Sequence, residues 1–258
     1  MKSLILAKAD LTAEVEKYIL DATTILERSF TFHQKSEEFR ELYRTCLAVS
    51  GVLSEMNSAR LKPGIKPLRS IALRIPLLAA AGQSSTIKVE LRQFIELTLW
   101  TIYFTDHPVE WQNFVGRRGI GFSRDTRKPI SFAAHRELTA YTDYALEYME
   151  VEPSGVAVRA IKKIEQDKRE LNSAVHAGHI ARSPLLNVPV DRFDPREGKR
   201  LTGLVKRIFG HSVILLAAFD KRKFDRLPAG ARAYFDWLIE PSFQKQIRSG
   251  PFGVGDIS

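Results

Sequence analysis

Apolar residues recur three and four positions apart along most of the chain, which is the spacing of one face of an α-helix. No run of alternating apolar and polar residues is long enough to indicate a β-strand. The pattern therefore predicts an all-α protein, a helical bundle of about seven to nine helices. The predicted helices span about residues 12–30, 36–61, 68–81, 86–105, 131–150, 156–176, 199–224 and 228–247.

Capping residues and prolines set the expected helix boundaries in the first half of the chain. Ser36 is followed by two glutamates, so it combines the side-chain acceptor and the early negative charge that open a helix. Pro63, Gly64 and Pro67 are expected to separate this helix from the next one. Pro76 is expected to kink or break that next helix, because proline removes a backbone donor and clashes with the preceding turn.

The predicted helix 86–105 is apolar nearly all round, which is typical of a helix at the centre of a bundle. Arg92 and Glu96 lie one turn apart on this helix. Burying charges is costly unless they are paired. The two residues therefore indicate either a structural ion pair or helix contact, or polar groups that support a functional site.

The segment 177–199 is rich in proline, glycine and charged residues and is the best candidate for a boundary within the chain. The helices on its two sides can share one core, and 258 residues fit one large domain. We therefore expect a single α-helical domain over residues 1–258, with the helices at 199–247 packed on the preceding ones.

The chain is basic, with a formal net charge of +9 at pH 7 and a pI near 9.6. This charge predicts an anionic partner, with nucleic acid first and an acidic protein or membrane surface after it. A loop expected at 116–130 combines cations with an aromatic ring, which suits a nucleic-acid backbone and a stacked base; the alternative is a solvated loop. Its candidate nucleic-acid-binding residues are Arg117, Arg118, Phe122, Arg124, Arg127 and Lys128.

Cys46 is the only cysteine, which excludes an intrachain disulfide and a cysteine-based zinc site within one chain. The apolar run at the start is too short for a secretory signal, and the most apolar windows, 87–104 and 212–219, are interrupted by charges or short. A lone thiol suits a reducing compartment. We therefore expect a cytoplasmic protein without a membrane span.

Motifs for several common chemistries are absent from the sequence. It has no phosphate loop, no Gly-x-Ser-x-Gly elbow, no His-Glu-x-x-His and no EF-hand loop. Gly119 and Gly121 lack the preceding strand and the third glycine of a dinucleotide fingerprint. His176 and His179 have no nearby carboxylate and make a poor metal site. We expect neither a metal nor another cofactor.

Polar residues form one stripe on the predicted helix 156–176. Arg169, Asn172, Ser173 and His176 lie at positions i, i+3, i+4 and i+7. A guanidinium can hold a phosphate oxygen and an imidazole can transfer protons near neutral pH, so the stripe suits a phosphodiester. The alternative is an ordinary solvated face, with His176 capping the helix end.

Around this stripe the chain resembles the HEPN superfamily of helical proteins, over about residues 35–180. The family signature is an arginine followed, after four to six residues, by a histidine near a helix end. Arg169 and His176 match it with six residues between them, and Asn172 supplies a polar group inside the motif. The segment 91–108 is similar to the central helix that precedes the motif.

The resemblance implies metal-independent RNA cleavage. The ribose 2′-hydroxyl would attack the adjacent phosphate, His176 would move protons, and Arg169 would stabilise the charged phosphate. The family site usually forms across a homodimer in a prokaryotic defence or toxin system, and residues such as Arg92 and Glu96 sometimes support it. Inactive relatives are also common.

Three functions are therefore expectations from the sequence. The first is a HEPN-like ribonuclease or an inactive relative that acts on RNA as a dimer. The second is a non-enzymatic helical adaptor of a multi-subunit complex, which an exposed apolar patch around Trp111, Phe114 and Phe122 would favour. The third is a nucleic-acid-binding scaffold that uses the basic loop alone.

Overall fold

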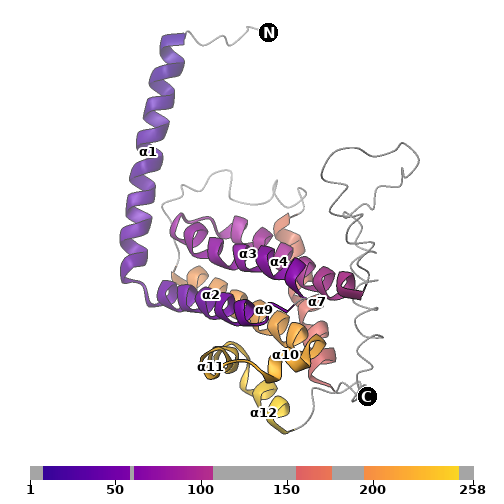
Figure 1. Ribbon diagram of the computed structural model, residues 1–258. Coiled ribbons are helices and arrows are strands. Elements are labelled where there is room, and N and C mark those ends of the chain that lie inside the picture. The colour runs from indigo at the N-terminus through magenta and orange to yellow at the C-terminus, as the bar shows by residue number, and fades with distance from the viewer. Residues whose placement is uncertain (1–7, 59–60, 107–154, 176–194, 250–258) are drawn as a thin grey trace, which may run out of the picture.

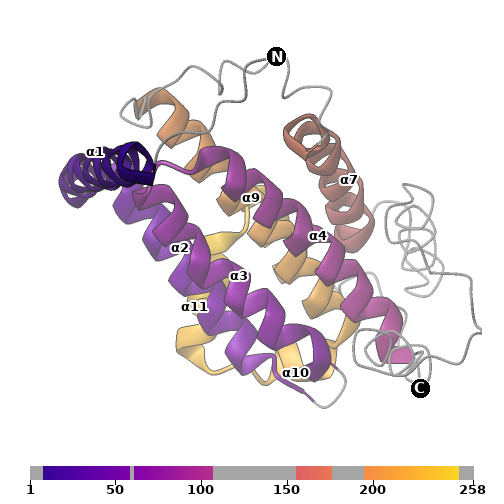
Figure 2. The same cartoon turned by 90° about the horizontal axis from the view of Figure 1, so that it is seen from above.

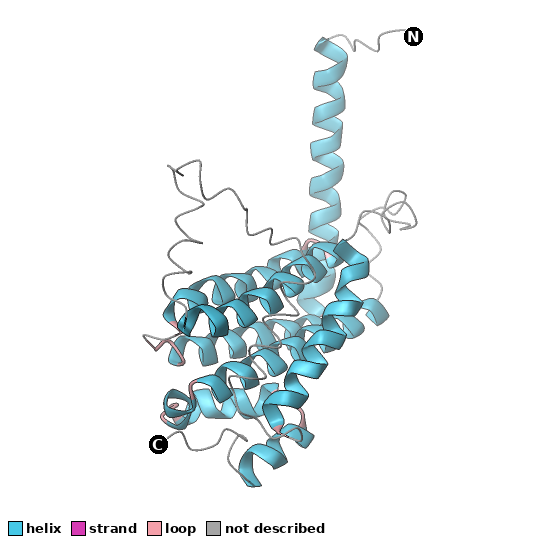
Figure 3. Ribbon diagram, turned by 90° about the vertical axis from the view of Figure 1, so that its right-hand side faces the viewer, coloured by secondary structure: helices cyan, strands magenta, loops and turns pink. Residues whose placement is uncertain are grey.

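In a computed structural model of the protein, the described residues are 8–58, 61–106, 155–175 and 195–249, and they form helices and no strand (Figures 1 and 3). This confirms the predicted all-α bundle of seven to nine helices. The nine helices of these residues are α1 (Lys8–Lys35), α2 (Glu37–Glu55), α3 (Lys62–Ala80), α4 (Ser84–Asp106), α7 (Val156–Val175), α9 (Pro195–Phe219), α10 (Lys221–Asp225), α11 (Ala229–Leu238) and α12 (Pro241–Ser249). The predicted helix at 131–150 lies outside the described residues.

Helix α1 extends away from the bundle for most of its length (Figure 1). Its C-terminal end meets the bundle, where the Ser29 hydroxyl donates a hydrogen bond to the carbonyl oxygen of Ala80 at the end of α3. The buried His33 ring packs against Phe39 of α2, with 5.0 Å between the ring centroids. Farther out, the side chains of Ile19 and Leu20 are 57% and 67% exposed. This part of α1 therefore presents apolar surface to solvent.

Hydrogen bonds of serine side chains lie at the start of α2 and in the connection between α2 and α3. The hydroxyl of Ser36 accepts a bond of 3.2 Å from the backbone N–H of Phe39, so the predicted cap is confirmed. The helix ends at Glu55, earlier than predicted. Met56 caps its C-terminal end, and the hydroxyl of Ser58 accepts a hydrogen bond from the N–H of Leu61, the residue that precedes α3.

The prolines before and within α3 do not break it, which corrects the prediction of a boundary at 63–67. Pro63 lies in the first turn, where its missing N–H costs no helical bond, and the helix continues through Pro67 and Pro76. Gly64 packs directly against Thr101 of α4, so that a Cβ at this position would overlap the threonine side chain. Gly82, with φ of 70°, ends α3.

Helix α9 lies in the middle of the bundle, packed against α2, α4, α7 and α11 (Figure 2). The side chains of residues 213–218 are almost fully buried. The predicted central helix, α4, is less enclosed, because it packs against α3, α7 and α9 but leaves Arg92 and Glu96 partly exposed. One hydrophobic cluster includes residues of α2, α4, α7 and α9. The described helices before and after residues 176–194 therefore share a core.

The two predicted C-terminal helices are each divided in two, which corrects the sequence prediction. Asp220 separates α9 from α10, and its carboxylate accepts hydrogen bonds from the N–H of Lys223 and the hydroxyl of Ser58. Ile239 has extended backbone at the end of α11, and Pro241 begins α12. The segment Gly198–Phe219 is long and apolar enough to cross a membrane by length and composition, and 83% of its 18-residue apolar stretch is buried inside the bundle, as in a core helix.

Candidate functional site

The predicted site residues fall on two neighbouring helices or outside the described residues. Arg92 and Glu96 lie on α4, Arg169 and Asn172 lie on α7, and the two helices pack against each other. His176 follows directly after α7 and lies outside the described residues. The basic loop and the predicted apolar patch also lie outside them: Trp111, Phe114, Arg117, Arg118, Phe122, Arg124, Arg127 and Lys128.

Arg92 and Glu96 form an ion pair on the face of α4 that meets α7. The Nε atom of Arg92 donates to Oε1 of Glu96 over 3.0 Å, and both side chains are about four-fifths buried. The Nη1 atom of Arg92 is buried and has no hydrogen-bond acceptor among the described residues. The Nη1 group of Arg92 can therefore donate a hydrogen bond to a ligand, because no described residue accepts one from it.

Lys168 lies on the side of α7 that faces this pair. Lys168 is only 7% exposed, and its side chain forms no hydrogen bond or ion pair within the described part of the chain. Burial lowers the pKa of Lys168, the nearby charge of Arg92 lowers it further, and Glu96 and Glu165 partly oppose this change. Arg169 also lowers it. Two arginines and two glutamates thus influence the ammonium group of Lys168, and none of the described carboxylates forms an ion pair with it.

Arg169 and Asn172 continue the polar stripe along α7. Arg169 is exposed, so its guanidinium is accessible from solvent. Asn172 is half-buried, one turn beyond Lys168, and its Oδ1 atom is buried without a donor among the described residues. We call the set formed by these residues the α4–α7 polar seam; its members are Arg92, Glu96, Glu165, Lys168, Arg169 and Asn172.

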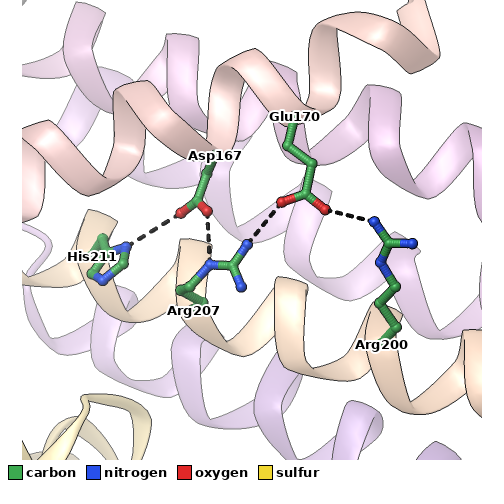
Figure 4. Close-up of polar contacts among 5 residues, drawn as sticks. All are labelled: Asp167, Glu170, Arg200, Arg207 and His211. Carbon is green, nitrogen blue, oxygen red and sulfur yellow. Dashed lines mark hydrogen bonds and ion pairs between the residues drawn. The ribbon is translucent and has the colours of Figure 1, made fainter.

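The opposite flank of α7 carries a second charged group, which connects α7 to α9 (Figure 4). Asp167 accepts a hydrogen bond of 2.7 Å from Nε of Arg207, and its other oxygen lies 3.4 Å from Nδ1 of His211. Glu170 lies 3.2 Å from Nη2 of Arg207 and 3.3 Å from Nη2 of Arg200. The α7–α9 network, made of these five residues, runs from the buried Asp167 and His211 to the exposed Arg200.

The α7–α9 network fixes α7 on the bundle instead of offering a reaction site. Asp167 and His211 are only 3% and 1% exposed, and the His211 ring also packs against Phe243, with 5.5 Å between centroids. A substrate has no room at such buried groups. The network escaped the sequence analysis because its partners are about forty positions apart. Asp167 on the apolar side of α7 was the one signal that pointed to it.

The described residues contain neither a cluster of metal-binding side chains nor an exposed thiol. These residues contain no group of three His, Cys, Asp or Glu side chains arranged to hold a metal ion. Cys46 is fully buried, and burial raises the pKa of its thiol, so the nucleophilic thiolate is suppressed. Comparison of the chain with protein-family models, with curated proteins and with solved structures gives no significant match.

Proposed function

We propose that this chain is a HEPN-like, RNA-directed protein, a metal-independent ribonuclease or an inactive relative, whose RNA contacts lie at the α4–α7 polar seam. The observation that carries the proposal is the gathering of three cations, Arg92, Lys168 and Arg169, at this seam. The same stripe of α7 leads to His176, one to two turns farther along the chain. Three cations against two glutamates leave one excess positive charge at the seam, and cations together with a histidine of the same stripe suit a phosphodiester.

The roles of the stripe residues follow from their chemistry. The exposed guanidinium of Arg169 can donate two parallel hydrogen bonds to the non-bridging oxygens of a phosphate. The imidazole of His176 can take the proton of the ribose 2′-hydroxyl or give one to the leaving 5′-oxygen. The 2′-oxygen then forms a bond to phosphorus as the bond to the 5′-oxygen breaks, which yields a 2′,3′-cyclic phosphate and a 5′-hydroxyl without a metal ion.

The remaining expectations belong to this proposal. A homodimer would bring two copies of the stripe to one RNA, and a cytoplasmic defence or toxin system would give such a nuclease its setting. The α7–α9 network supports the proposal indirectly, because it holds the helix that carries Arg169 in a fixed rotation on α9. The basic loop at 116–130 remains a candidate for further RNA contacts.

The enzymatic part is tested by alanine variants of Arg169 and His176. Each variant should abolish cleavage of single-stranded RNA in EDTA while leaving helicity and oligomeric state unchanged. Lys163→Ala is the matched control, because Lys163 is an exposed cation of α7 outside the seam and its loss should leave cleavage unchanged. Cleavage that persists in both the Arg169 and the His176 variants would refute the enzymatic role.

A non-enzymatic adaptor is the second candidate, and α1 is the observation that favours it. This helix extends from the bundle (Figure 3). It exposes large apolar side chains, among them Ile19, Leu20 and Phe30. An adaptor should hold a stoichiometric protein partner in its native cells and lose it on the double change Ile19→Asp and Leu20→Asp. A chain that keeps the same partner after this change contradicts a binding role for α1.

A further inference from the structure

We propose that Lys168 and Arg92 form a second phosphate-binding subsite in the α4–α7 polar seam, which holds an RNA phosphodiester next to the one bound by Arg169. The identity of the ligand as RNA rests on the function proposed above. The subsite itself is argued from the burial, the contacts and the charges of its own residues.

The first argument is that Lys168, a mostly buried residue, has no hydrogen-bond or ion-pair partner among the described residues. Lys168 is only 7% exposed, and no described residue accepts a hydrogen bond from its ammonium group. Burying an ammonium group is costly unless an anion or several acceptors compensate. A phosphate bound at the seam would supply the direct anionic partner that Lys168 lacks among the described residues.

The second argument comes from Arg92, which approaches the same place from α4. Its Nε atom is used by Glu96, but its buried Nη1 atom has no acceptor among the described residues. A guanidinium presents its donors in one plane, so Nη1 can bind an oxygen while Nε remains paired with the carboxylate. Arg92 is therefore held in place by Glu96 with a donor to spare.

The third argument is the contrast between the two flanks of α7. On the α9 flank, Asp167 and Glu170 are each paired with an arginine. On the α4 flank, Arg92 is paired with Glu96, but no described carboxylate forms an ion pair with Lys168 or Arg169. Burial, Arg92 and Arg169 lower the pKa of Lys168, and Glu96 and Glu165 oppose this change. The three cations of the seam exceed its two glutamates by one charge, and a bound anion would balance that excess. The paired charges on the α9 flank are expected for a structural contact, and the excess of cations on the α4 flank is expected for a ligand site.

Asn172 extends the subsite toward the sugar. Its Oδ1 atom is buried without a donor among the described residues, one turn along α7 from Lys168. A ribose 2′-hydroxyl both donates and accepts hydrogen bonds, so it can satisfy this side-chain amide. DNA lacks that hydroxyl. The subsite therefore favours RNA over DNA of the same sequence, and Asn172→Ala should reduce this preference.

The test measures binding rather than cleavage, in a His176→Ala background, with a labelled single-stranded RNA and fluorescence anisotropy at several salt concentrations. Lys168→Met should weaken binding about tenfold and lower the salt slope by about 0.7, the value for one lost contact to a single strand. Lys163→Met removes an exposed cation of the same helix and should change the Kd less than about twofold.

A merely structural lysine would behave differently in two respects. Lys168→Met removes a buried charge, so the melting temperature should stay the same or rise, whereas loss of a structural contact would lower it. Carbon-detected NMR of lysine side chains should also show that the Lys168 pKa rises when pyrophosphate is added, because the added anion favours the charged ammonium.

The outcomes separate this inference from the proposed function. Unchanged Kd and salt slope for Lys168→Met refute the subsite, while loss of cleavage in the Arg169→Ala variant would still support the nuclease. If the protein binds no RNA, the proposed function fails. A Lys168 pKa that still rises with pyrophosphate would then support a phosphate site for another ligand, and an unmoved pKa would overturn the subsite.

Discussion

Asp167 is the buried end of the α7–α9 network, and its replacement by asparagine tests how α7 is held. The change removes one negative charge and keeps the size of the side chain. In the protein this carboxylate lies 2.7 Å from Nε of Arg207 and 3.4 Å from Nδ1 of His211. Both Asp167 and His211 are shielded from water, so the lost attraction is replaced poorly by solvent.

The expected cost follows from these distances and exposures. Opposite charges with centres about 4 Å apart attract by about 4 kcal/mol at an effective dielectric constant of about 20. Arg207 is 36% exposed, which weakens the attraction, and the amide oxygen of asparagine can still accept from its Nε atom. We therefore expect the free energy of unfolding to fall by about 2–3 kcal/mol, which lowers the Tm by about 4–12 °C.

Urea unfolding followed by circular dichroism measures this cost, with Glu170→Gln as the matched control. The control is the same acid-to-amide change on the same helix, facing the same Arg207. Glu170 is 43% exposed and its second partner, Arg200, is 80% exposed, so the control should cost less than about 1 kcal/mol. If the Asp167 variant loses no more stability than the Glu170 variant, the account of α7 anchoring is wrong.

Two further predictions concern packing and pH. Gly210→Ala on α9 should destabilise the protein by about 1–3 kcal/mol, because a Cβ there would lie 2.8 Å from the carbonyl oxygen of Leu238. Gly203→Ala on the same helix meets open space, so it should be neutral or stabilise the protein by up to about 1 kcal/mol. Thermal melts of both variants check this, and equal effects would contradict it. Burial lowers the pKa of His33 below its ordinary value of 6.5 in the folded protein. Between the two pKa values the unfolded state therefore binds more protons than the folded state. The stability that His33 contributes should thus decrease as the pH falls from 8 through 6.5 toward the lowered pKa of the folded state. Urea unfolding across this range should show the stability difference between the wild type and His33→Gln shrinking toward acid pH; a constant difference would contradict the burial argument.

The sequence predicted the helical segments better than their ends. The apolar spacing located the described helices, and the cap at Ser36 was correct because its geometry is local. The predicted boundary at 63–67 was wrong and α3 continues through Pro76 without a break, because packing of α3 against α2 and α4 outweighs the local cost. The division at Asp220 was missed because its carboxylate bonds to Ser58, far away in the sequence.

Part of the candidate site was visible in the sequence, and part was not. The pairing of Arg92 with Glu96 could be predicted because the two residues lie one turn apart on one helix. Their proximity to Lys168 depends on how α4 packs against α7, which no local pattern encodes. The α7–α9 network depends in the same way on the rotation of α7 against α9, so Arg207 and His211 carried no signal of their own.

The central claim, that RNA contacts the α4–α7 polar seam, is tested most directly by photocrosslinking. A 4-thiouridine-labelled RNA would be crosslinked to the full-length His176→Ala protein, and the attached peptides identified by mass spectrometry. The account predicts crosslinks in peptides that cover Arg92–Glu96 of α4 and Lys168–Asn172 of α7, and it predicts fewer of them at the same RNA concentration in the Lys168→Met variant. Crosslinks confined to the 116–130 loop or to α1, with none at the seam, would contradict it.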